Sequence, residues 1–220
     1  MSTLANLRTL SELSSWQAGF FTTAQATTRG VLPATLTRLL NAGIVTRPQR
    51  GVYRMTAAPA NEFEYEETFA TWLATDPQTT ATERIAYNPN EAIAAGSLAL
   101  KLHNDPILHL DRYDFVSAKR RQTNNPRIHY RQRHLTREEV TLARGIPAMT
   151  IERAIADLVE LNVDLSTIEA VAESQILRGV TTGTDINKAI TAALPNSDST
   201  DVQDLIHNLE SLGQPMIKQT

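Results

Sequence analysis

Arginine, threonine, asparagine and glutamine side chains gather between residues 22 and 54, and these side chains suit contacts with nucleic acid. Arginine forms bidentate hydrogen bonds with guanine edges or phosphates, and the amide and hydroxyl side chains reach base edges or phosphates. We therefore predict a DNA-contacting segment here. The residues expected to make the contacts are Thr22, Thr23, Gln25, Thr35, Thr37, Arg38, Asn41, Arg47, Gln49, Arg50, Tyr53 and Arg54.

Three of these residues are expected to have particular roles. Arg38 lies in the middle of a helical pattern, so we expect it to read base edges in the major groove. Arg50 and Arg54 lie in a predicted hairpin and are expected to hold backbone phosphates or to enter a minor groove. Tyr53 is expected to be half-buried at the base of that hairpin, with its hydroxyl directed to a phosphate.

Two short helices must position these side chains. Gly30 separates residues 24–29 from a second helical pattern, because glycine is favoured where a chain leaves a helix. Pro33 suits the first turn of the second helix. Leu36, Leu39 and Leu40 follow at helical spacing and form one apolar stripe, which leaves the polar residues of this helix on the other side.

A basic hairpin follows the second helix. Residues 44–45 and 52–55 are apolar and bracket the turn sequence Arg-Pro-Gln-Arg-Gly, which predicts two strands joined by a turn. Residues 3–13 carry leucine at every third position, which predicts a first helix that completes a three-helix core. Three helices followed by a hairpin are the parts of a winged helix-turn-helix, a DNA-reading module.

Charge is unevenly distributed along a chain whose formal net charge is −3. Residues 1–60 carry six Lys/Arg and one Asp/Glu, and residues 112–137 carry eight and one. The remaining segments, 61–111 and 138–220, are acidic. Segregated positive charge is the electrostatic pattern expected of a nucleic-acid binder, even where the whole protein is acidic.

The second basic segment has two open interpretations. Residues 107–117 and 128–135 alternate apolar and polar side chains, which predicts a second β-hairpin. Its basic side chains either form a solvated face or provide a second contact surface for DNA or an acidic partner protein. The residues of this candidate surface are Lys119, Arg120, Arg121, Arg127, Arg131 and Arg133.

Several function classes find no support in the sequence. The chain has no cysteine, so it offers no disulfide, thiolate metal site or cysteine nucleophile. It has no glycine-rich phosphate loop before a lysine and no Gly-x-Ser-x-Gly motif. None of its four lysines has a carboxylate two positions earlier, the usual nuclease pattern. We predict no enzymatic activity, no metal and no cofactor.

The location of the protein is predicted from two further patterns. No apolar run approaches the roughly 18 residues of a membrane span. The N-terminal residues lack the basic and apolar regions of a signal peptide. We therefore expect a cytoplasmic protein without a membrane partner.

These patterns predict an α+β protein of two domains. Residues 1–58 form the winged helix-turn-helix, and the proline and small residues that follow mark a boundary. Residues 59–194 form a mixed α/β domain with a central β-hairpin or small sheet and several helices. Residues 195–220 form a polar tail with one weak helix over 202–212.

Two blocks of the chain resemble the AbiEi-type antitoxins, which are transcription regulators of type IV toxin–antitoxin operons. The first block contains GFFTTAQA at 19–26, Gly-Val at 30–31, LTRLLNAGI at 36–44 and RGVYR at 50–54. The second block is GIPAMTIERAIADL at 145–158. The resemblance extends from about residue 5 to residue 180.

The resemblance implies a function for each domain. The winged helix would repress its own operon by binding repeated operator sequences, and the C-terminal α/β domain would provide antitoxin activity. The cognate toxin in such systems is a nucleotidyltransferase-like enzyme, and a direct toxin complex does not follow from the resemblance. No enzymatic activity of the chain itself is implied.

The sequence therefore favours a DNA-binding transcriptional repressor that acts as an antitoxin. Its expected partners are double-stranded DNA at its own operator and, functionally, the toxin, and a homodimer on DNA is left open. The alternative is a protein-interaction module that binds a partner through the basic 112–137 hairpin, with weak or non-specific DNA binding.

Overall fold

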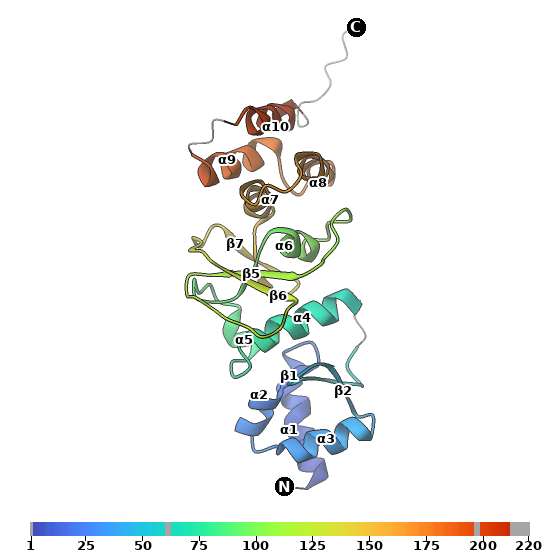
Figure 1. Cartoon of the computed structure of the whole chain (residues 1–220). Coiled ribbons are helices and arrows are strands. Elements are labelled where there is room, and N and C mark those ends of the chain that lie inside the picture. The colour runs from blue at the N-terminus through green and yellow to red at the C-terminus, as the bar shows by residue number, and fades with distance from the viewer. Residues whose placement is uncertain (1, 60–62, 196–198, 212–220) are drawn as a thin grey trace. The chain divides into compact units, whose positions relative to one another are not determined.

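The chain folds into two compact units, residues 1–88 and 89–220, each with its own β-sheet (Figure 1). The structure is a computed structural model, which describes residues 2–59, 63–195 and 199–211. Helices and small sheets occur in both units, so the predicted α+β fold class is confirmed.

Unit 1 starts with the order of elements of a winged helix-turn-helix. Its three-stranded sheet is antiparallel, with the strand order β1-β3-β2. The strand β1 was not predicted, since three residues are too few to show an alternating pattern. The elements are α1 (Thr3–Ser15), β1 (Phe20–Thr22), α2 (Thr23–Thr28), α3 (Pro33–Asn41), β2 (Val45–Gln49), β3 (Val52–Met55), α4 (Phe63–Thr75) and α5 (Ala81–Arg84).

The three N-terminal helices pack on one face of this sheet. Phe21 of β1 and Tyr53 of β3 are opposite each other in the sheet, and their rings stack with centroids 5.7 Å apart. They join Leu10, Leu36 and Leu39 in one buried cluster. Burial of such a side chain contributes about 1.5–3 kcal/mol, so the leucines of the predicted stripe hold α3 against the sheet.

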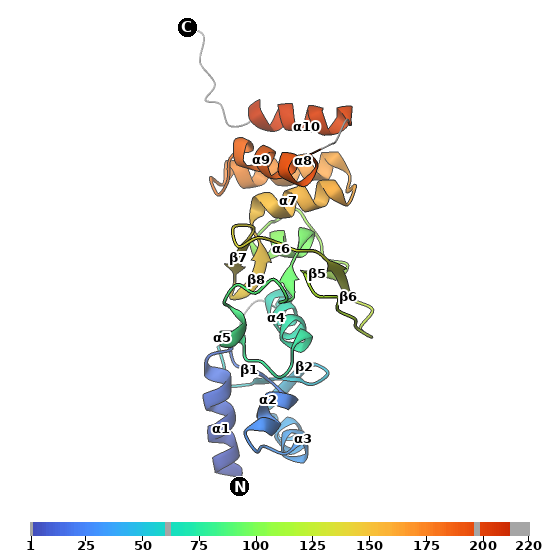
Figure 2. The same cartoon turned by 90° about the vertical axis from the view of Figure 1, so that its left-hand side faces the viewer.

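The other face of the sheet is covered by α4, and this moves the end of the unit beyond the predicted boundary after residue 58. Consecutive strand residues point to opposite faces, so Phe20 points away from Phe21. The Phe20 ring lies 5.2 Å from that of Phe69, which in turn contacts the fully buried Trp72. Figure 2 shows α4 on one side of the sheet and α1 to α3 on the other.

Unit 2 contains a five-stranded mixed sheet with the strand order β6-β5-β4-β8-β7. The predicted hairpin of residues 107–117 and 128–135 is wrong, because β5 and β6 pair in parallel with Tyr113 opposite Ile128. The elements are β4 (Ile93–Ala94), α6 (Gly96–Leu102), β5 (Tyr113–Ser117), β6 (Ile128–Gln132), β7 (Val140–Ala143), β8 (Ile146–Met149), α7 (Ile151–Glu160), α8 (Leu165–Leu177), α9 (Gly183–Ala193) and α10 (Thr200–Ser211).

The error has a physical reason. An alternating pattern shows that a segment is a strand with one buried face, but it carries no information about strand direction. Residues 118–127 are enough chain to return to the start of β5, so β6 runs in the same direction. The hairpin of this unit is formed instead by β7 and β8, whose turn residues Arg144 and Gly145 both have positive φ.

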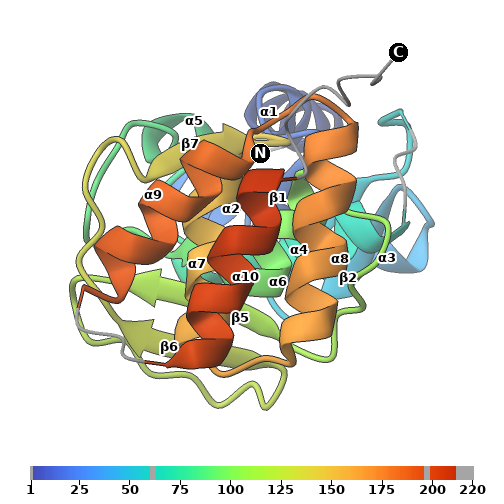
Figure 3. The ribbon, with the colours of Figure 1, turned by 90° about the horizontal axis from the view of Figure 1, so that it is seen from above.

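The four C-terminal helices of the described residues, α7 to α10, pack in layers on one side of unit 2. The helix α7 contacts α6, α8 and α9, and α10 lies over α8 and α9 (Figure 3). Leu205 and Leu209 of α10 are buried in this contact. The predicted weak helix over 202–212 thus corresponds to α10, while residues 196–198 and 212–220 of the predicted tail lie outside the described residues.

Candidate nucleic-acid interface

The second helix of the predicted motif, α3, has a polar exposed stripe. Leu36 and Leu39 are buried, whereas Ala34, Thr37, Arg38 and Asn41 are exposed at positions i, i+3, i+4 and i+7. Such spacing places these four side chains on one face of the helix. A helix of this kind has the width that the major groove of B-DNA admits.

Arg38 extends from the middle of this stripe. One of its terminal nitrogens donates a hydrogen bond to the hydroxyl of Thr35, with 3.2 Å between the two atoms. Thr35 itself is buried, so it serves to orient Arg38 rather than to reach a ligand. The guanidinium keeps its other donors for a partner, because one hydrogen bond uses only one of five N–H groups.

The wing, formed by β2 and β3, supplies two more exposed arginines. The guanidinium of Arg47 lies 5.7 Å from the centre of the Tyr53 ring, and Tyr53 stacks on Phe21. This places Arg47 on the face of the sheet that also carries α3. Arg50 lies at the tip of the wing beside Gly51, whose φ of +80° is a conformation that favours glycine.

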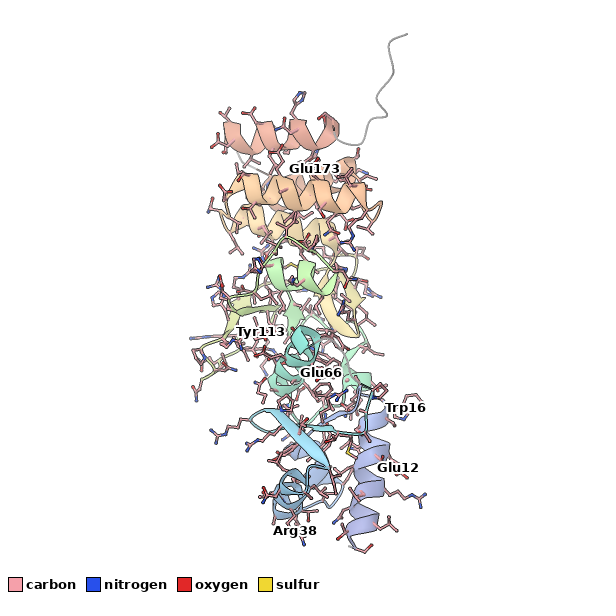
Figure 4. All side chains as sticks on the ribbon, turned by 90° about the vertical axis from the view of Figure 1, so that its right-hand side faces the viewer. Glu12, Trp16, Arg38, Glu66, Tyr113 and Glu173 are labelled. Atoms are coloured by element: carbon pink, nitrogen blue, oxygen red, sulfur yellow. The ribbon has the colours of Figure 1, made fainter. Side chains whose placement is uncertain are left out.

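Positive charge on this surface is not neutralised by ion pairs within the described residues. Among the described residues, no carboxylate forms an ion pair with Arg38, Arg47 or Arg50. Figure 4 shows Arg38 on the side of the small sheet opposite Glu66. The exposed polar and basic residues of α3 and the wing form one surface, the α3–wing surface, which consists of Thr37, Arg38, Asn41, Arg47 and Arg50.

Thr22 and Gln25 were expected at the interface, but the structure gives them a supporting role. Both are buried and form a capping box at the start of α2. The Thr22 hydroxyl also donates to the carbonyl of Pro77, and the Gln25 amide donates to the carbonyl of Thr79 at 2.8 Å. Because these contacts occupy them inside unit 1, we remove both residues from the proposed interface.

Three residues of the wing are also directed inward. Arg54, expected to hold phosphate, is only 8% exposed and pairs with Glu66 of α4 at 3.2 Å. Tyr53, expected to be half-buried, is buried in the core on the opposite face. Gln49 accepts a hydrogen bond from the hydroxyl of Thr71 at 2.9 Å. The sequence could not show this, because α4 covers the sheet face on which Arg54 lies.

Thr23 and Arg29 lie at the two ends of α2. Thr23 is half-buried, and its backbone N–H donates to the carbonyl of Gly51 at 2.9 Å, which ties α2 to the wing. Arg29, which was not predicted, is exposed at the end of α2. Hydrogen bonds from Thr80 lower the pKa of Glu83, and the charge of Arg29 adds to this effect.

The second basic segment is largely neutralised within unit 2. Arg131 forms two hydrogen bonds with the fully buried carboxylate of Asp157, the first at 2.9 Å. Burial acts to lower the pKa of Arg131, but the contact with Asp157 raises it overall. Arg133 donates to Glu160 at 3.0 Å. These two arginines therefore hold β6 to α7 and are removed from the candidate surface.

The other residues of that segment divide into two groups. Arg121 donates to the carbonyl of Asn90 at 2.6 Å, and the Arg127 guanidinium lies 5.1 Å from the centre of the Tyr113 ring. Lys119 and Arg120 are exposed. Of the six residues of the candidate surface, Lys119, Arg120 and Arg127 are therefore exposed, whereas Arg121, Arg131 and Arg133 are half-buried.

Within the ranges 2–59, 63–195 and 199–211, no three His, Cys, Asp or Glu side chains come together as a metal site would need. In the same ranges, no helix combines the length and the apolar character that crossing a membrane requires.

The order of helices and strands in unit 1 is consistent with a winged helix-turn-helix, the class of module that the sequence predicted. Residues 8–56 match the model of a family described as "Transcriptional regulator, AbiEi antitoxin". The resemblance drawn from the sequence is thus confirmed over these residues. The match supports an antitoxin or transcriptional regulator and covers the segment that contains the whole α3–wing surface.

Whole-chain comparisons add information on the fold. The crystal structure of the RV2827C protein from Mycobacterium tuberculosis superposes with a TM-score of 0.55 at 14% sequence identity. The superposition covers 97% of this chain and 78% of that one, so the similarity in fold includes both units. No curated protein matches the chain in sequence.

Proposed function

We propose that the protein is a sequence-specific DNA-binding repressor of its own operon and the antitoxin of a toxin–antitoxin pair. The observation that carries the DNA-binding part is the α3–wing surface, where Arg38, Arg47 and Arg50 have no carboxylate partner among the described residues. The family match of residues 8–56 supports regulation of transcription.

The proposed mechanism follows from the placement of these side chains. The helix α3 enters the major groove, and Arg38 with Thr37 and Asn41 reads base edges. Arg47 and Arg50 of the wing bind phosphates on the flanking backbone. Each phosphate contact releases condensed counterions, so the affinity falls steeply as salt rises.

The antitoxin part of the proposal rests on the family match. We propose that unit 2 counteracts a nucleotidyltransferase-like toxin, and that unit 1 limits expression of both proteins by binding repeated operator sites. The proposal assigns the chain no catalytic step, and it does not require a stable complex with the toxin.

Binding of the purified chain to its own upstream DNA tests the proposal. The upstream fragment and a scrambled fragment of equal length and composition are compared at two salt concentrations. We expect binding to the upstream fragment to survive the higher salt and binding to the scrambled fragment to be lost. Equal affinity for both fragments at both salt concentrations would contradict sequence-specific recognition.

The antitoxin role has a separate test in cells. The gene neighbouring the chain's own gene is expressed alone, with the whole chain, and with unit-1 variants that no longer bind DNA. We expect growth arrest in the first case and rescue in the other two, because unit 2 is intact in both. Continued arrest with the wild-type chain would contradict the antitoxin role and leave the DNA-binding proposal standing.

A further inference from the structure

The helix α1 exposes a row of side chains that the fold of unit 1 does not use. Leu4, Arg8, Glu12 and Trp16 follow one another at intervals of four residues, and all four are exposed. Leu4 is 78% exposed and Trp16 is 81% exposed. Tryptophan is among the residues enriched at binding hot spots.

When the helix is reversed, the row keeps its pattern of apolar, charged, charged and apolar residues, and the positions of the two opposite charges are exchanged. The two apolar residues, Leu4 and Trp16, lie at the ends, about 18 Å apart along the axis. Arg8 and Glu12 lie at equal distances inside them and carry opposite charges. A second α1 placed antiparallel on this row would therefore bring Leu4 against Trp16 and Arg8 against Glu12, twice each.

Such a match is what a two-fold symmetric interface demands. In a two-fold interface the same surface is used by both copies, so residue i contacts residue j and residue j contacts residue i. Rows of side chains spaced by four residues are also the ridges that interlock when helices pack. The Arg8 and Glu12 side chains pair within the helix at 2.9 Å while 82% and 66% exposed, so they can exchange partners at little cost.

A hollow beside the row provides room for an apolar end. It has a volume of about 450 Å³ and is lined by α1, by Ala18 and Gly19, and by residues 55 and 57–59. Ser11, Ser14 and Ser15 form its α1 wall, and Ser15 precedes Trp16 in the chain. In the antiparallel arrangement, the N-terminal turn of the second helix, with its Leu4, lies over this hollow.

We propose that the exposed row of α1 is a docking surface for a second copy of this chain, in an antiparallel two-fold arrangement. The row is short, and an interface of this size binds weakly in free solution. Two copies bound to adjacent DNA sites are held at a high effective concentration, which makes a weak contact sufficient. This last consequence rests on the proposed DNA-binding function, whereas the docking surface does not.

The position of the row is compatible with DNA binding by both copies. Figure 4 shows Glu12 and Trp16 projecting from α1 on one side of unit 1, while Arg38 lies on α3 on the other side. Docking through α1 therefore leaves each α3–wing surface open. Two copies related in this way would present two recognition helices, as a repeated operator requires.

Charge reversal on the whole chain tests the proposal in free solution, without DNA. We expect sedimentation of the wild-type chain to shift with concentration from 24.3 kDa toward twice that mass. Arg8→Glu and Glu12→Arg, each alone, should raise the dimer Kd roughly tenfold or more, because each places like charges opposite each other twice. A wild-type chain that stays at 24.3 kDa at all concentrations would overturn the proposal.

Mixing the two variants separates contact between copies from effects within one helix. The Arg8→Glu chain carries two acids and the Glu12→Arg chain two bases, so the mixture should dimerise although neither variant does alone. Glu173→Arg, on the exposed surface of α8, matches the charge change of Glu12→Arg and should leave the dimer unchanged. A mixture that stays monomeric, or an equal loss of the dimer in the Glu173→Arg control, would refute docking through α1.

Trp16→Ala tests the apolar ends of the row. Trp16 is exposed in the single chain, so its removal should leave the melting temperature within a few degrees of wild type. We expect it to abolish the concentration-dependent shift in mass. Retention of the wild-type shift would show that copies of the chain associate elsewhere.

If the chain also binds its operator, the same variants link the dimer to DNA. They should lose cooperativity between two sites while keeping the affinity for a single site, since the α3–wing surface is unchanged. Failure of all DNA binding would contradict the proposed function alone, because the sedimentation results do not depend on it.

Discussion

The two basic segments of the chain use arginine in opposite ways. In the wing, Arg47 and Arg50 are exposed, and no carboxylate within the described residues pairs with them. In the segment 112–137, Arg131 and Arg133 are paired with Asp157 and Glu160 of α7. The first segment exposes its positive charge to solvent, and the second uses it to attach a strand to a helix.

The difference comes from which acidic residues the fold brings near. Unit 2 places the acidic α7 beside β6, so its arginines find partners within the same unit. In residues 2–59, the one acidic side chain is Glu12, and it faces outward on α1 together with Arg8. A count of basic residues along a sequence therefore does not distinguish a binding surface from an internal ion-pair network.

The largest expected effect is on stability, and it tests the arginines that are paired within unit 2. Asp157→Ala leaves the guanidinium of Arg131 half-buried without its carboxylate and should lower the free energy of unfolding by about 3–5 kcal/mol. Urea denaturation measures the loss, with the exposed Glu173→Ala as control. A loss as small as that of the control would show that the Arg131 contact with Asp157 is not structural.

Arg54→Ala tests whether this wing arginine stabilises unit 1 through its ion pair with Glu66 and does not contact DNA. Its removal takes the ion pair with Arg54 away from the half-buried Glu66 and should destabilise unit 1 by about 1.5–3 kcal/mol. The salt dependence of DNA binding should not change, measured at a temperature where the variant is fully folded. A smaller salt slope in a stable variant would instead place Arg54 on a phosphate.

Arg38→Ala tests the unpaired side of the comparison. We expect a loss of about 1–3 kcal/mol in binding to the operator, with relaxed preference at the base pair that Arg38 contacts. Gel shifts against the operator and against single-base variants measure both effects. Arg120→Ala, an exposed arginine of the second basic segment, is the matched control and should bind as wild type does.

The smallest expected effect belongs to the wing tip. Arg50→Ala should weaken binding to all DNA sequences about equally and reduce the slope of log K against log salt by about 1. Titrations at several salt concentrations with operator and scrambled DNA measure it. A loss confined to the operator would make Arg50 a base reader rather than a phosphate contact.

Much of unit 1 could be predicted from the sequence, because its signals are local. The leucine stripe of α3, the proline at its first turn and the Arg-Gly turn of the wing each depend on neighbouring residues. The same patterns predicted that Thr35, Thr37, Arg38 and Asn41 would lie outside the apolar stripe; the last three are exposed, but Thr35 is buried. Local periodicity therefore predicts most of the exposed side of a short helix, while the residue next to the stripe depends on packing.

The remaining part of the site depended on contacts distant in sequence. Thr22 and Gln25 have polar side chains and a position suited to DNA, but residues 77–79 cover them. Arg54 lies one residue from Tyr53 on the opposite sheet face, and only the packing of α4 there buries it. The direction of β6 could likewise not be predicted from the sequence, because an alternating pattern is identical in parallel and antiparallel strands.

By itself, the sequence determined the order of helices and hairpin in unit 1, the apolar faces of these helices and the presence of two basic segments. These are properties of short windows, in which periodicity, capping and turn residues act over a few positions. Only the tertiary structure decided which arginines remain unpaired, because an ion pair depends on side chains from distant segments meeting in space. The α3–wing surface and the exposed row of α1 are what remain on unit 1 after those pairings are made.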